Sequence, residues 1–219
     1  MSVLNTRRLW LMAASLAAVA VYVGLAHVVA SEEAAADAVA DPLKPAADFS
    51  NIADQRARSV ALFTEAARVL QSPRCLNCHP VTRQPTQGDE LKLHVPRVIA
   101  DAEGHGPPGL ACSTCHQVEN ARTFADPIAS VPGHAPWALA PASMAWQGLS
   151  IGEICAQLKD RKRNGNRTLE QIHHHMAEDG LVGWAWHPGE GRKPAPGTWE
   201  QFGELIHAWI TTGAHCPSS

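Results

Sequence analysis

The chain has 219 residues and a formal net charge of −3 at neutral pH. That length suits one folded domain with a substantial hydrophobic core. The mild acidity and the lack of an extended basic stripe argue against a nucleic-acid-binding protein. The one basic cluster, residues 160–167, is best interpreted as a solvated loop, with a docking patch for an acidic partner as the alternative.

The N-terminus has the pattern of an export signal. Arg7 and Arg8 precede an apolar run from Leu9 to Leu25, and small residues follow before Ser31. This pattern is typical of a secretory signal peptide over residues 1–30. The apolar run is also close to the length of a membrane anchor, so cleavage stays open. In both cases residues 31–219 are predicted to be periplasmic. Without Arg7 and Arg8 their charge falls from −3 to −5.

Composition then separates a linker from a folded domain. Residues 31–49 are rich in Ala, acidic and interrupted by two prolines, which predicts a linker. Residues 50–219 are predicted to form one mainly α domain, with about four helices and long loops wrapped around it. The two long segments 80–111 and 117–149 are rich in Pro and Gly and should be irregular.

Four helices are predicted from periodicity and caps. Residues 53–72 carry apolar side chains at helical spacing, and Pro73 ends this helix. Three capping boxes begin the others, at 150–159, 168–177 and 198–211. Their cap pairs are Ser150 with Glu153, Thr168 with Gln171, and Thr198 with Gln201. The last helix has a continuous apolar side, which we expect to pack against the helix at 53–72.

One pentad of residues occurs twice, in RCLNCHP at 74–80 and in ACSTCHQ at 111–117. C-x-x-C-H is the attachment signature of c-type haem. The two thiols add to the porphyrin vinyl groups, and the histidine binds the iron from the proximal side. The predicted attachment residues are Cys75, Cys78, His79, Cys112, Cys115 and His116.

Two other readings of the cysteine pairs are weaker. Paired zinc knuckles would leave both histidines unexplained, and the gap of 32 residues between the pentads is longer than usual. Redox-active or structural C-x-x-C disulfides would leave the histidines unexplained too. The same gap is too short for a complete second cytochrome domain, so we expect two covalently bound haems to share one fold and to lie close together.

Two cysteines remain, Cys155 and Cys216. Six is an even number, and disulfides persist outside the cytoplasm, so we predict a bridge between these two residues. It would tie the middle of the domain to its C-terminal tail. Two free buried thiols are the alternative.

The chain resembles a group of exported bacterial dihaem c-type cytochromes. The likeness covers roughly residues 70–217, in the stretches NCHP, HGPPGLACSTCHQ, MAW, LKDRKRNG, LVGWAWHPGEGR and AWITTGAHCP. Members are often labelled as the cytochrome subunit of isoquinoline 1-oxidoreductase. The layout is also similar to that of the small dihaem subunit of periplasmic nitrate reductase, in which a histidine lies between the two pentads. The resemblance implies a cytochrome c-like fold and a role in electron transfer.

The distal iron ligands have several candidates. Each iron usually takes His or Met as its sixth ligand. His94, between the pentads, is our first candidate for one iron, and His105 is its competitor. Met144, on a Pro-rich loop after the second pentad, is a further candidate. The alternative is that Met144 is an ordinary core methionine.

The second distal ligand is sought in QIHHHMAEDG, residues 171–180. On a helix, His173 and His175 flank the apolar stripe on opposite sides, while His174 points away from it. Periodicity alone slightly favours His173. The resemblance points instead to His175, which matches the histidine of an H-x-A-x-D-x-L-V pattern. We therefore expect His79 and His116 below the two irons, and His94 and His175 above them.

The sequence favours an electron carrier between an oxidoreductase or dehydrogenase and another cytochrome or an oxidase. Haem supplies the redox chemistry, and no separate catalytic motif stands out. A dihaem enzyme of the peroxidase or sulfur-compound oxidase type is the alternative, and it requires one open iron site. A redox or gas sensor is a third hypothesis, although no output domain is visible in the sequence.

Overall fold

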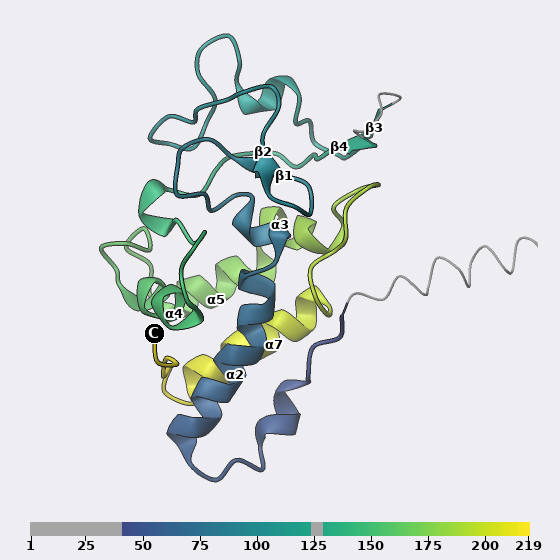
Figure 1. The fold of residues 1–219 in the computed structure, drawn as a ribbon. Coiled ribbons are helices and arrows are strands. Elements are labelled where there is room, and N and C mark those ends of the chain that lie inside the picture. The colour runs from purple at the N-terminus through teal and green to yellow at the C-terminus, as the bar shows by residue number, and fades with distance from the viewer. Residues whose placement is uncertain (1–40, 124–128) are drawn as a thin grey trace, which may run out of the picture. The chain divides into compact units, whose positions relative to one another are not determined.

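The computed structural model describes residues 41–123 and 129–219. The predicted signal or anchor, and residues 31–40 of the predicted linker, lie outside these ranges. The described chain is mainly α-helical, as predicted (Figure 1). Its longest elements are the helices α2 (Gln55–Leu70), α4 (Ile151–Lys159), α5 (Leu169–Glu178) and α7 (Trp199–Thr211).

Three of these helices begin at the predicted capping boxes. In each, the hydroxyl of the N-cap residue accepts a hydrogen bond from the third backbone N–H of the helix, and the side chain of that third residue accepts one from the backbone N–H of the cap. The N-caps are Ser150, Thr168 and Thr198. Asp54 caps α2 by accepting a 2.6 Å hydrogen bond from the backbone of Ala57. The predicted helix starts therefore agree closely with the structure.

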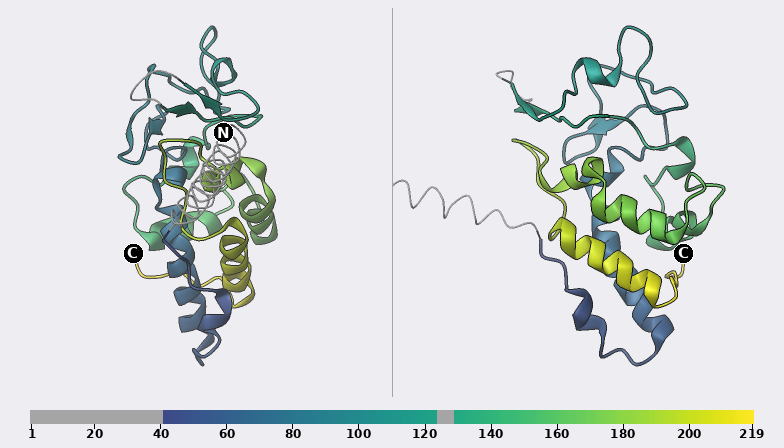
Figure 2. Two further views of the ribbon diagram at one scale, coloured as in Figure 1. Left: turned by 90° about the vertical axis from the view of Figure 1, so that its right-hand side faces the viewer. Right: turned by 180° about the vertical axis from the view of Figure 1, so that it is seen from behind.

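Helices α2 and α7 pack against each other, as the apolar side of α7 predicts. The rings of Phe63 and Trp209 have centroids 4.8 Å apart. The hydroxyl of Ser59 donates a 3.2 Å hydrogen bond to the Trp209 carbonyl. The largest fully buried side chains gather around this contact: Trp209, Phe63, Phe202, Leu62, Leu70 and Ile154. Figure 2 shows the two helices side by side from two further directions.

Short elements join the helices. The single-turn helices are η1 (Ala46–Phe49), α3 (Pro73–Leu76), η2 (Cys112–Thr114), η3 (Ala142–Met144), α6 (Gly180–Gly183) and η4 (Trp184–Trp186). Two antiparallel hairpins pair β1 (Thr86–Gln87) with β2 (Lys92–Leu93), and β3 (Ala121–Arg122) with β4 (Ser130–Val131). The sequence predicts no strands, and two-residue strands carry too little alternation to be recognised. The segments that contain the hairpins gather at one end of the helices (Figures 1 and 2).

The folded part begins earlier than predicted. Residues 41–49, assigned to the linker from composition, pack on the helices. Leu43 and Phe49 are buried, and the backbone N–H of Lys44 donates a 3.0 Å hydrogen bond to the Glu65 carboxylate. Two large apolar side chains are enough to anchor this segment, although its average composition is that of a linker.

The predicted disulfide between Cys155 and Cys216 is present. It joins α4 to the C-terminal tail, and Lys159 adds a 2.6 Å hydrogen bond from the same helix to the Ala214 carbonyl. In the ranges given above, no helix combines the length and hydrophobicity that crossing a bilayer requires.

Candidate functional site

The two pentads adopt the same backbone turn. In the first, the N–H of His79 donates to the carbonyl of Cys75 at 3.1 Å. In the second, the N–H of His116 donates to the carbonyl of Cys112 at 2.9 Å. A short helical segment overlaps the start of each pentad, α3 in the first and η2 in the second, so the local fold as well as the sequence is repeated. The four cysteines of the pentads are free thiols.

The imidazole rings of both pentads are held by their Nδ1 atoms. Nδ1 of His79 lies 2.6 Å from the carbonyl oxygen of Met144, and Nδ1 of His116 lies 2.7 Å from that of Pro132. A carbonyl accepts only, so Nδ1 carries the proton and donates it. The other ring nitrogen, Nε2, is left as a lone-pair donor. Histidines that bind metals are typically oriented in this way by a backbone carbonyl or a carboxylate.

A tryptophan stacks on each of these rings. Trp146 lies parallel to His79 with centroids 3.6 Å apart, and Trp137 lies parallel to His116 at 4.6 Å. The indole of Trp146 is itself fixed, because its N–H donates a 2.8 Å hydrogen bond to the Gln157 side chain in α4. Stacking and hydrogen bonding together leave each imidazole little rotational freedom.

We call the surroundings of the first pentad the first site and those of the second pentad the second site. At the second site, the ring of His94 lies near that of His116. His94 follows β2 directly, so the first hairpin sets its position. Its Nδ1 donates a 2.8 Å hydrogen bond to the Pro96 carbonyl, which again leaves Nε2 free. The ring centroids of His94 and His116 lie 6.0 Å apart. Two metal–nitrogen bonds of about 2 Å, and about 1 Å from each nitrogen to its ring centre, sum to about the same separation. The spacing of the two rings would therefore allow His94 and His116 to hold one metal ion between them.

His175 lies near His79 at the first site. The two rings interact electrostatically, and this contributes to the lowered pKa of His79. Nδ1 of His175 lies 2.9 Å from a carboxylate oxygen of Asp179, the residue at the C-terminal cap of α5. Of the histidines in the described ranges, the four whose Nδ1 is hydrogen-bonded to an oxygen are His79, His94, His116 and His175. These are the four predicted ligands.

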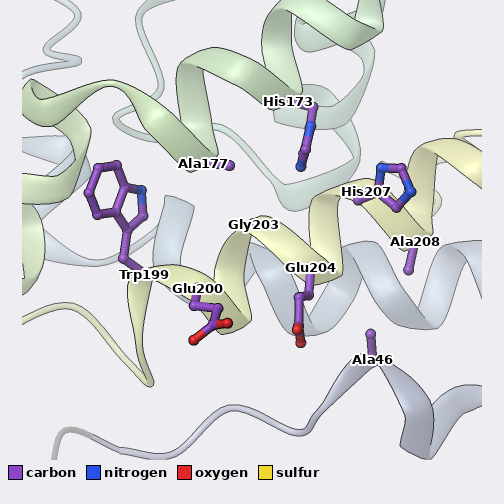
Figure 3. Close-up of a pocket in the computed structure, with 9 residues that line it drawn as sticks. All are labelled: Ala46, His173, Ala177, Trp199, Glu200, Gly203, Glu204, His207 and Ala208. Atoms are coloured by element: carbon purple, nitrogen blue, oxygen red, sulfur yellow. The ribbon is translucent and has the colours of Figure 1, made fainter.

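The competing candidates are placed less favourably. His173 lines a separate pocket of about 610 Å³, where its ring lies 5.2 Å from that of His207 (Figure 3). His105 is exposed on its loop. The backbone of Met144 lies on the Nδ1 side of His79, away from Nε2. His94 and His175, by contrast, each lie near the histidine of a pentad.

A cavity of about 500 Å³ lies at the second site. Its walls include His94, His116, Cys112 and Cys115, and Cys78 of the first pentad also reaches it. Cavities of this size hold cofactor-sized ligands. Cys78 and Cys112 also interact electrostatically, which indicates that the two sites adjoin.

Burial favours the neutral forms of several histidines and thiols at the two sites. It lowers the pKa of His79 to about 4, against the opposing effect of the hydrogen bond to Met144. It raises the pKa of Cys75 to about 12 and that of Cys78 to about 11. It also lowers the pKa values of His116 and His175. At neutral pH these imidazoles are uncharged, which is the form that binds a metal.

Sequence reasoning missed the residues that orient the ligands. Asp179 could have been found, because it stands four residues after His175, just past the end of the helix predicted at 168–177. The stacking partners Trp137 and Trp146 could not be selected from among the tryptophans of the chain. The carbonyls of Met144 and Pro132 carry no sequence signal, because every residue has one.

Comparison of the chain with models of protein families, with curated proteins and with solved structures gave no match. Across residues 41–123 and 129–219, no three His, Cys, Asp or Glu side chains are grouped closely enough to hold a metal ion between them.

Proposed function

We propose that the protein is an exported dihaem c-type cytochrome that carries electrons between an oxidoreductase and another redox carrier. The observation that carries the proposal is the repeated site: two C-x-x-C-H turns of like geometry, each with a second oriented histidine nearby. A single such site has weaker support, because one C-x-x-C-H can arise by chance. The cytochrome c-like fold, with α2 leading into the first pentad and packing on α7, belongs to the same proposal.

On this proposal the residues of the chain hold the cofactor and tune it. The cysteine pairs attach one haem each, and His79 with His175, and His116 with His94, provide nitrogen ligands from both sides. Bound haem supplies reversible one-electron chemistry at the iron. Met144, Pro132, Pro96 and Asp179 keep the imidazoles in the Nδ1–H tautomer. Adjacent sites suit electron passage within the chain, and the N-terminal pattern supports export to the periplasm.

The test is the visible spectrum of the exported protein, made in a host that attaches haem and reduced with dithionite. We expect sharp c-type bands that do not change with carbon monoxide, since both irons have two protein ligands. A shift with carbon monoxide would reveal a vacant or weakly held iron site and would favour a dihaem enzyme or a gas sensor. No haem bands at all would contradict the proposal.

A further inference from the structure

Arg74 is a buried cation with unused donors. It stands in α3, next to Cys75, and only 3% of its surface is exposed. Its Nη2 donates to the Gly88 carbonyl at 3.0 Å and to the Asp89 carboxylate at 2.5 Å. Its Nε and Nη1 atoms are buried without a hydrogen-bond partner. Leaving charged donors unpaired in a protein interior is costly, so these two atoms point to a missing acceptor.

Arg74 lines the cavity of the second site, and so does Arg192. Arg192 donates to the hydroxyl and carbonyl of Ser130. Burial and repulsion from Arg74 both lower its pKa. Two arginines therefore line one cavity.

The acids of this cavity are already paired. Asp89 pairs with Arg74, Glu90 with Lys92, and Glu190 with Arg122. Arg192 has no carboxylate partner in the described part of the chain. Arg192 thus binds only uncharged hydroxyl and carbonyl oxygens, and Arg74 keeps two buried donors without an acceptor next to the cavity. Both features suit a carboxylate.

We propose that Arg74, with Arg192 beside it, binds a propionate carboxylate of the haem attached at Cys112 and Cys115. The assignment rests on the proposed function. It gives the buried donors an acceptor and the unpaired cation a counter-charge. It also links the sites, because Arg74 precedes Cys75 of the first pentad while it faces the second cavity.

The test is the Arg74→Gln variant of the full exported protein with haem attached. Without the cation, the propionate charge stabilises the ferric form. We expect the reduction equilibrium constant of one haem to fall about tenfold, which is about 59 mV for one electron. The propionate bending band in the resonance Raman spectrum should shift as well, and the haem content should stay at two per chain.

Arg97→Gln is the matched control. It removes the same charge from an exposed side chain on the loop of His94, so both the potential and the Raman band should change little. Arg74→Gln/Asp89→Asn tests whether an unpaired Asp89 causes the effect. The double variant conserves net charge and should still shift the Raman band. If Arg74→Gln does not fold, Arg192→Gln provides the same two readouts.

Two results would overturn the assignment while the proposed function stands. One is two attached haems with neither the potential nor the Raman band changed in Arg74→Gln. The other is a wild-type potential that responds to added phosphate while Arg74→Gln does not respond, which would mean that the site takes a free anion. Wild-type protein without haem would instead overturn the proposed function itself.

Discussion

At the scale of single residues, the account depends on which nitrogen of each histidine is free. The Nδ1 of His175 is bound to Asp179, and that of His94 to the Pro96 carbonyl. Each hydrogen bond fixes a tautomer, so each ring presents Nε2. A histidine on a helix face or a loop has no such constraint by default. The hydrogen bond at Nδ1 therefore distinguishes a candidate ligand from an ordinary surface histidine.

Replacing His175 with Ala should remove one distal ligand. We expect one of the two haems to become high-spin, which low-temperature electron paramagnetic resonance of the oxidised protein detects. His173→Ala is the matched control, because that side chain lies in a different pocket, and both haems should remain low-spin. A wholly low-spin spectrum for His175→Ala would show that another residue binds this iron.

The lowered pKa of the half-buried His79 predicts how the stability of the haem-free chain responds to pH. Its pKa in the fold is about 4, below the ordinary value of 6.5, so the unfolded chain binds more protons between these values. The free energy of unfolding should therefore fall as the pH is lowered from 6.5 to 4. Urea unfolding of haem-free protein across this range measures it, and His79→Gln should weaken the dependence. An identical pH dependence in both proteins would contradict the burial of a neutral imidazole.

At the scale of elements, helix α4 fixes the tryptophan that stacks on His79 at the first site. Gln157 is fully buried and accepts the indole N–H of Trp146, which in turn stacks on His79. Replacing Gln157 with Leu leaves that N–H without a partner in the interior. We expect the free energy of unfolding to fall by about 1–3 kcal/mol in urea titrations. Gln55→Leu, at an exposed helix start, should change it by less than about 0.5 kcal/mol.

Sequence predicts the helices better than the segments that carry the ligands. The capping boxes at Ser150, Thr168 and Thr198 are local signals, so the helix starts follow from a few residues. The hairpin that places His94 depends on backbone pairing between Thr86 and Leu93. No local sequence pattern predicts this pairing. His94 was therefore predicted from its place between the pentads and not from its geometry.

At the scale of the whole molecule, the disulfide closes the fold onto its tail. The bridge from Cys155 to Cys216 encloses a sequence separation of 61 residues. On the chain-entropy model, a loop of this size contributes about 4 kcal/mol. Cys155→Ser should lower the free energy of unfolding by about that amount and leave the haem content unchanged. Thiol labelling should find Cys216 newly free, and its absence would show that the bridge does not form in the wild type.

The fold places both pentads beside one cavity although 32 residues separate them in sequence. That arrangement makes the two sites parts of one unit, as the short gap between the pentads predicts. Residues 41–49 extend the same unit beyond the boundary predicted from composition.

The most direct test of the central claim is peptide mass mapping of the purified exported protein. The account predicts a chain heavier by two haems, with one on the peptide that contains Cys75 and Cys78, and one on the peptide that contains Cys112 and Cys115. A chain of unmodified mass, from a host that attaches haem to other proteins, would contradict it.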